Sequence, residues 1–252
     1  AGFKAMGLIE RRRGEEAALE EWAGHVENAE FADVLPGLRA VTDGRRETFA
    51  QDFLLDQIPN ASGLLGLAVD LVRRARERKK PDIERPSAYQ DRGEKKLWER
   101  QDRRLDDFDR EVDAHMLASV MARAAALPPA QKLAAFEGIS PGTGTGRAAY
   151  LERARKLVAA SKLSDPAVAK RLFDDPAAVE SFKDPMITLA LALAQTYEAN
   201  EARGEARAGK LSRLGPRYFT MLRKIRSGPV YPDANGTLRF SYATITGYRP
   251  RE

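Results

Sequence analysis

The sequence predicts a mainly α-helical protein that ends in a short β-segment. Over most of its 252 residues, apolar side chains recur at intervals of three and four, which is the spacing of one helix face. Strict alternation occurs only near the end, where Leu238, Phe240 and Tyr242 are separated by polar residues. A strand needs a neighbour for its backbone groups, and no upstream segment offers one. We therefore expect an irregular multi-helix domain over residues 1–228 and a β-strand or hairpin over 229–252 that belongs to another sheet.

The first helix is predicted over about residues 3–28, with Leu19, Trp22 and Val26 on one face. Residues 33–48 are expected to be looser because a proline and two glycines interrupt them.

The clearest amphipathic helix is predicted over residues 61–78, directly after Pro59 and before the cations that precede Pro81. One long helix is then expected over residues 94–126. Its apolar positions keep three- and four-residue spacing: Trp98, Leu105, Phe108, Val112, Met116 and Val120.

A short helix is expected to start at Pro128-Pro129, and the glycine-rich residues 138–147 are predicted to form a flexible connection. Those glycines lack the spacing of a phosphate-binding loop, and no strand precedes them.

Three Asp-Pro pairs predict helix starts, because Asp caps the first turn and Pro tolerates its first position. They are Asp165-Pro166, Asp175-Pro176 and Asp184-Pro185. The third opens the most apolar helix, expected over 186–208, and a final helix is predicted over 216–226.

Composition narrows the functional classes. Lys and Arg exceed Asp and Glu by five, but the two signs are interleaved, which favours a solvated surface over a nucleic-acid face. Cysteine is absent, so disulfides and cysteine-ligated metals are excluded. No apolar run is long enough for a transmembrane span.

The chain offers no complete set of catalytic residues. Its two histidines, His25 and His115, are isolated, and His115 falls on an apolar helix face where a partly buried structural ring is the simpler interpretation. No nucleophile elbow is present. We therefore expect no catalytic residue, no metal site and no cofactor in this chain.

Three segments resemble the S46 family of bacterial dipeptidyl-peptidases, which are serine exopeptidases. They are Arg76-Glu-Arg-Lys-Lys-Pro-Asp-Ile-Glu-Arg85, Ser181-Phe-Lys-Asp-Pro-Met186, and Tyr231-Pro-Asp-Ala-Asn-Gly-Thr-Leu-Arg239 followed by Gly247-Tyr248. The third is long and unusual, and the order and spacing of all three match the family.

The resemblance implies a chymotrypsin-like double β-barrel with a large helical domain inserted between the catalytic Asp and Ser. On that basis the chain is the helical domain and the first strand returning to the barrel, without the catalytic triad. The helical domain is expected to cover the active-site cleft, so that dipeptides are removed from peptide N-termini. The resemblance further implies peptide substrates, contact with the rest of the barrel, a homodimeric parent enzyme and a periplasmic, secreted or cell-surface location.

In the family, an Asn of the helical domain helps to bind the free amine of the substrate. Asn60, which precedes the predicted helix 61–78, is the matching candidate. The alternative is that Asn60 is only a helix cap or turn residue after Pro59.

Two other functions stay open at this point. The basic, arginine-rich helices would also suit a nucleic-acid-binding or adaptor module. A stand-alone scaffold whose terminal strand pairs across a homodimer is a third possibility.

Overall fold

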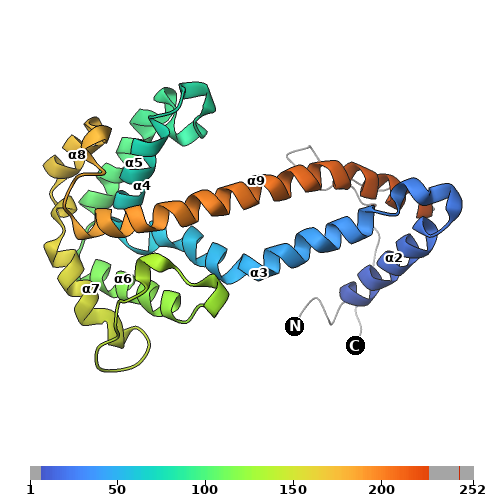
Figure 1. Ribbon diagram of the computed structural model, residues 1–252, viewed down its shortest axis with the longest axis horizontal. Helices are drawn as coiled ribbons and strands as arrows, with labels where there is room; N and C mark the ends of the chain where they lie inside the picture. The colour runs from blue at the N-terminus through green and yellow to red at the C-terminus, as the bar shows by residue number, and fades with distance from the viewer. Residues whose placement is uncertain (1–6, 227–243, 245–252) are drawn as a thin grey trace. The chain divides into compact units, whose positions relative to one another are not determined.

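The computed structural model describes residues 7–226 and residue 244, and this part of the chain is mainly helical with no strand (Figure 1). The α-helices are α2 (Leu8–Ala23), α3 (Val34–Ala61), α4 (Gly63–Glu77), α5 (Glu94–Asp106), α6 (Arg110–Ala125), α7 (Ala148–Ala160), α8 (Pro166–Asp174) and α9 (Pro185–Ile225). The predicted strand and the predicted boundary at residue 228 lie outside the described residues.

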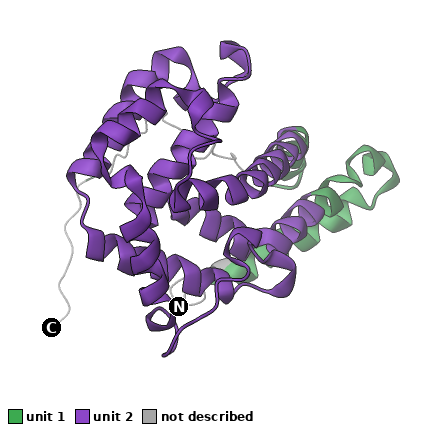
Figure 2. Ribbon diagram, turned by 60° about the vertical axis from the view of Figure 1, so that its left-hand side comes forward, with its two compact units in different colours: residues 1–37, 213–252 green, residues 38–212 purple. Residues whose placement is uncertain are grey.

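The chain divides into two compact units, residues 1–37 with 213–252 and residues 38–212 (Figure 2). The division falls within α3 and α9, each of which contributes to both units.

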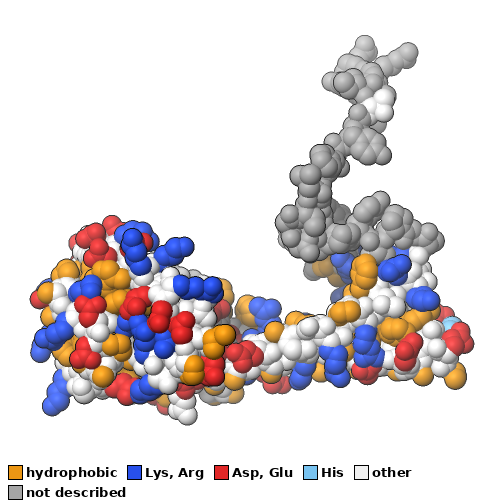
Figure 3. All heavy atoms as spheres, turned by 90° about the horizontal axis from the view of Figure 1, so that it is seen from above, with side chains coloured by type: hydrophobic (Ala, Val, Ile, Leu, Met, Phe, Trp, Pro, Cys, Tyr) orange, Lys and Arg blue, Asp and Glu red, His pale blue; other side chains and the backbone are white. Residues whose placement is uncertain are grey.

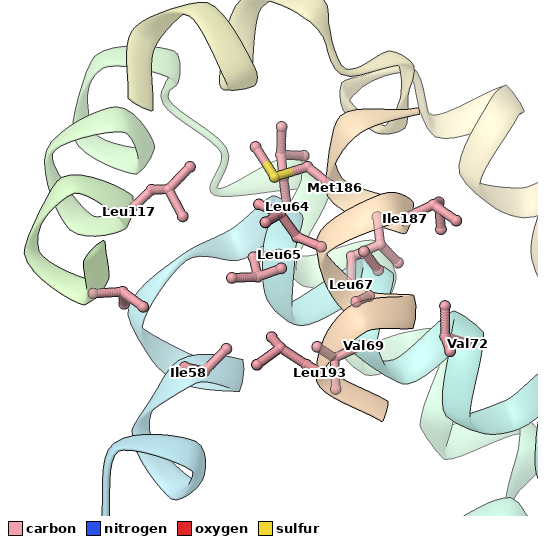
Figure 4. Close-up of a cluster of buried hydrophobic side chains, with 14 of the residues drawn as sticks. Ile58, Leu64, Leu65, Leu67, Val69, Val72, Leu117, Met186, Ile187 and Leu193 are labelled. Carbon is pink, nitrogen blue, oxygen red and sulfur yellow. The ribbon is translucent and has the colours of Figure 1, made fainter. Parts of the chain in front are cut away.

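The core of the larger unit surrounds α4. Leu64, Leu65 and Leu67 of this helix are almost fully buried and lie among apolar side chains of α3, α6 and α9 (Figure 4). Met186 and Ile187 of α9 are fully buried in the same cluster. The strong apolar spacing of residues 61–78 and of the start of α9 therefore predicted the two helices that dominate this core.

In the smaller unit, α2 ends at Ala23 with Gly24 as its C-cap, and the 3₁₀ segment Val26–Phe31 follows. Leu19 is buried as expected, whereas Val26 is 92% exposed, so its predicted place on the buried face was wrong. The rings of Trp22 and Phe31 in this unit lie 5.3 Å apart.

The predicted interruption at residues 33–48 is also wrong, because α3 is continuous from Val34 to Ala61. Pro36 is the third residue of this helix, where its missing N–H would have no intrahelical partner. Gly37 lies directly against Leu214, since an added Cβ would come within 2.9 Å of that side chain. Tertiary packing therefore overrides the local breaking signals.

Pro59 lies inside α3, close to its C-terminal end. A proline cannot donate to the carbonyl four residues earlier, which is that of Leu55. The hydroxyl of Tyr197 on α9 donates to this carbonyl at 2.9 Å and satisfies it. Burial raises the pKa of Tyr197, which keeps the hydroxyl protonated as a donor.

Helix α9 joins two helices that were predicted to be separate. It runs through Pro216 without interruption. A proline inside a helix costs about 3 kcal/mol. Three apolar side chains on the two sides of Pro216 are buried in the smaller unit, namely Leu214, Met221 and Leu222. Burial of each contributes about 1.5–3 kcal/mol, which outweighs the proline.

The long helix predicted over residues 94–126 is instead two helices, α5 and α6. Asp109 interrupts it, because its side chain accepts a hydrogen bond from the Val112 N–H at 2.8 Å and starts α6 there. Of the apolar residues predicted to share the buried face, Val112 and Met116 are 60% and 41% exposed, whereas Val120 is buried.

Two of the three Asp-Pro pairs start α-helices as predicted, and the third does not. Asp165 caps α8, and Asp184 caps α9 by accepting from the Met186 and Ile187 N–H groups. Asp175 precedes only a 3₁₀ turn, Pro176–Ala178. The segment after Pro128 also forms 3₁₀ turns, Pro129–Gln131 and Ala134–Phe136, and residues 138–147 contain no helix.

Several charged side chains on the helix surfaces are paired across neighbouring helices. Arg73 and Arg76 of α4 pair with Glu201 and Glu198 of α9, and Arg203 of α9 donates to Asp52 of α3 at 2.8 Å. Figure 3 shows cationic and anionic side chains interspersed over the face in view. Among the described residues, no helix has the length and apolar character needed to cross a membrane.

Candidate functional site

Asn60 lies at the corner between α3 and α4. It is the next-to-last residue of α3, its side chain is exposed, and no other described residue hydrogen-bonds that side chain. It lines a groove of about 500 Å³, together with residues of α5 and α6. The candidate residue therefore faces open space in which a ligand has room to bind.

Ser62, rather than Asn60, caps α4. The Ser62 hydroxyl accepts a hydrogen bond from the Leu65 N–H at 3.3 Å. Asp113 of α6 completes the cap by accepting from the Gly63 N–H and from the Ser62 hydroxyl. The alternative in which Asn60 serves as the cap of α4 is therefore wrong, and the Asn60 amide is left free.

A buried carboxylate, that of Asp70, connects α4 to α5 near this corner. Asp70 of α4 accepts hydrogen bonds from the Tyr89 hydroxyl at 3.0 Å and from Gln101 at 2.9 Å. It also accepts from Arg100 and Arg104, both at 3.0 Å. Four donors offset the cost of burying this charge.

Arg104 links Asp70 to the residue before Asn60. One guanidinium nitrogen donates to Asp70, while the other donates to the Pro59 carbonyl at 2.8 Å. The end of α3 is thereby held against α5, and the backbone on both sides of Asn60 is fixed by Arg104 and by the Ser62 cap.

Gly66 allows the two helices to approach this closely. A Cβ at this position would lie 2.3 Å from the Pro59 carbonyl oxygen and 3.2 Å from Arg104 Nη1. Only glycine leaves room for that carbonyl. The Leu-Gly-Leu pattern in the sequence gave no indication of this contact.

Two ionisable groups at the corner have shifted pKa values. Burial raises the pKa of Asp113, although the hydrogen bonds from Gly63 and Ser62 act in the opposite direction. Burial and the neighbouring Asp70 carboxylate raise the pKa of Tyr89, so its hydroxyl remains a donor at neutral pH. Both groups therefore serve in hydrogen bonding within the fold.

The groove does not contain an arrangement suited to nucleophilic or metal-dependent catalysis. Within residues 7–226, no cluster of His, Asp and Glu could hold a metal ion. The two histidines face carboxylates on their own segments. His115 Nε2 lies 3.3 Å from Glu111, and His25 Nδ1 lies 4.0 Å from Glu27. The described part of the groove leaves room for a ligand, and neither histidine lies beside a hydroxyl nucleophile in the interactions that the structure shows.

Sequence reasoning proposed Asn60 as a candidate but did not predict the residues that fix its position. Ser62 before an apolar helix is a recognisable cap signal. Asp70 and Asp113 fall on apolar helix faces, where a carboxylate indicates a buried hydrogen-bonding role. The contact between Arg104 and Pro59 spans 45 residues and had no local signal.

Comparison with known proteins places the chain in a family. The sequence model of the family described as Peptidase S46 matches residues 1–252. The chain belongs to the peptidase S46 family.

A curated relative supports the same assignment. The "Asp/Glu-specific dipeptidyl-peptidase" of Shewanella putrefaciens (strain CN-32 / ATCC BAA-453) is 31% identical over 265 residues. The alignment covers all of this chain but 34% of the relative, so the chain spans about a third of the length of that protein.

Proposed function

We propose that this chain is the helical cap of a serine-type dipeptidyl-peptidase that removes dipeptides from the N-termini of peptides. The observation that carries the proposal is the match of the S46 family to the whole chain, although the chain covers only 34% of its dipeptidyl-peptidase relative. The catalytic barrel and its Ser, His and Asp would then be supplied by other parts of the polypeptide.

The helical architecture supports this division of labour. A peptidase that releases dipeptides must leave its cleft open on one side and block it on the other. A helical body with a packed core is suited to blocking a cleft.

Asn60 is proposed to help bind the free amino group of the substrate. An ammonium taken out of water needs oxygen acceptors, and an exposed amide that is free of internal partners can provide one. Arginines also line the groove, so the carboxylate that neutralises the ammonium would have to come from the rest of the enzyme.

Substitution of Asn60 tests this contact in the complete polypeptide. Loss of a hydrogen bond to a charged group costs about 1.5–3 kcal/mol, so Asn60→Ala should raise KM for dipeptide-releasing substrates about tenfold or more. Gln57→Ala, an exposed position of the same helix, is the matched control and should leave KM unchanged. A KM for Asn60→Ala equal to that of the control would remove Asn60 from the amine site.

The main activity is tested by product analysis. The complete polypeptide should release successive dipeptides from a decapeptide with a free N-terminus and leave the N-acetylated decapeptide intact. Release of single amino acids, or cleavage at internal bonds, would contradict the proposal.

The alternative of a nucleic-acid-binding or adaptor module has weaker support. Many arginines of the described helices are paired with carboxylates, as with Arg73, Arg76 and Arg203. Such pairing lowers the phosphate-binding capacity of a surface. Homodimerisation of the parent enzyme and its periplasmic, secreted or cell-surface location stay predictions from the family resemblance.

A further inference from the structure

One face of α5 and of the turn before it carries a row of cations. Arg92, in the 3₁₀ turn before the helix, is followed at four-residue intervals by Lys96 and Arg100, and then by Arg103. Residues three and four apart share a helix face, and like charges at this spacing destabilise a helix. We call these four residues the cationic face.

Most of this charge is not neutralised within the protein. In the part of the chain that the structure describes, Arg92, Lys96 and Arg103 are exposed and have no ion pair. Arg100 pairs with Asp70 but keeps 46% of its side chain exposed. By contrast, the adjacent Lys95 pairs with Glu99.

The cationic face borders a concave surface. Arg92, Lys96 and Arg100 line a pocket of about 370 Å³ together with Ser87, and no carboxylate contributes to its wall. A concave surface lined by one sign of charge concentrates ions of the opposite sign. Its ligand is therefore expected to be anionic.

Arg100 also lines the groove that contains Asn60, so the two concavities meet at this side chain. Two carboxylates of that groove are engaged, because Asp109 accepts from the Val112 N–H and Asp113 from the Gly63 N–H. Asp107, four residues after Arg103, is a further exposed acid of this groove. The anion-binding site is therefore limited to the stretch from Arg92 to Arg103.

The spacing of the cationic face suits an extended peptide. Residues four apart on a helix are separated by about 6 Å along its axis. Alternate side chains of an extended peptide lie about 6.6 Å apart on one side. Successive cations along the helix could therefore each contact one acidic side chain, with the contacted residues two apart in the peptide.

We propose that the cationic face binds an acidic segment of a peptide substrate through its Asp and Glu side chains. The acidic character follows from the four cations, while the choice of a peptide rests on the proposed peptidase function. Sites for single-stranded nucleic acid combine cations with aromatic rings for base stacking, and the wall of the 370 Å³ pocket has none.

The test is a binding measurement on the 252-residue chain by fluorescence anisotropy. The probes are fluorescein-labelled hexaglutamate, hexalysine and an oligothymidylate of matched charge. Hexaglutamate should bind saturably and more weakly as salt rises, and hexalysine should not bind. Lys96→Gln should weaken hexaglutamate binding about two- to fivefold, and the double variant Arg92→Gln/Lys96→Gln about tenfold.

Lys95→Gln is the matched control, since it removes the same charge from the neighbouring position, and it should leave the affinity unchanged. Circular dichroism checks that each variant stays folded. Absence of hexaglutamate binding, or equal effects of Lys95→Gln and Lys96→Gln, overturns the proposal. Tighter binding of the oligothymidylate through the same residues overturns the peptide assignment. Because this assay needs no catalysis, its failure is separate from failure of dipeptide release by the complete polypeptide.

Discussion

Gly66→Ala is the substitution that most sharply tests the packing of the α3–α4 corner. The new Cβ would lie 2.3 Å from the Pro59 carbonyl oxygen and 3.0 Å from its carbon. Both atoms are backbone, so no side chain can rotate away. The two helices must separate, and the hydrogen bond from Arg104 to the Pro59 carbonyl must lengthen or break.

The size of the effect follows from three contributions. Overpacking costs about 1–3 kcal/mol, and loss of a hydrogen bond to a charged group costs about 1.5–3 kcal/mol. The better helix propensity of alanine offsets up to about 1 kcal/mol. We expect the free energy of unfolding to fall by about 1.5–5 kcal/mol. For a protein of this size, a loss of 3 kcal/mol lowers Tm by roughly 6–12 °C.

Urea unfolding followed by tryptophan fluorescence provides the assay. Trp98 lies in the larger unit, with its ring 5.1 Å from that of Phe173, so a Trp22→Phe background reports on this unit alone. Gly209→Ala is the control, because nothing lies within 4 Å of its added Cβ, and it should stabilise by about 0.5–1 kcal/mol. Equal stability of the Gly66 and Gly209 variants would refute the account of this corner.

Two further predictions concern single interactions. Tyr197→Phe should lower the free energy of unfolding by about 1–2 kcal/mol, because it leaves the Leu55 carbonyl without a donor. The loss should be much smaller in a Pro59→Ala background, where the backbone N–H at position 59 can donate to that carbonyl instead. A double-mutant cycle in urea measures this difference, and equal losses in both backgrounds would contradict the prediction. Burial acts to raise the pKa of Glu94, but hydrogen bonds from Arg74 and Arg78 outweigh it and hold that pKa below its ordinary value of 4.5. The stabilisation by Glu94 should therefore be complete above about pH 5 and disappear as the pH falls through the lower folded-state pKa. Unfolding of the wild type and of Glu94→Gln over this pH range tests it, and a stability difference that grows on acidification would show the sign to be wrong.

The sequence predicted helices well where apolar spacing coincided with burial. Helix α4 and the start of α9 are examples, because their apolar residues form the core. It failed where a capping residue or distant packing decided the outcome. Asp109 divides a periodic segment into α5 and α6, whereas packing carries α9 through Pro216.

The candidate site was predictable only in part. Family resemblance led to Asn60, and the structure places this residue exposed on a groove. Its surroundings depend on long-range contacts, such as Arg104 with Pro59 and Asp113 with Ser62. These partners are separated by 45 and 51 residues, so local patterns could not pair them.

The central claim is that the chain is the helical cap of an S46 dipeptidyl-peptidase and depends on the rest of the polypeptide for catalysis. Mass spectrometry of the products from one decapeptide, incubated with the 252-residue chain or with the complete polypeptide, tests it most directly. The account predicts dipeptides with the complete polypeptide and an intact decapeptide with the chain alone. Turnover by the isolated chain, or no dipeptide from the complete polypeptide, would contradict it.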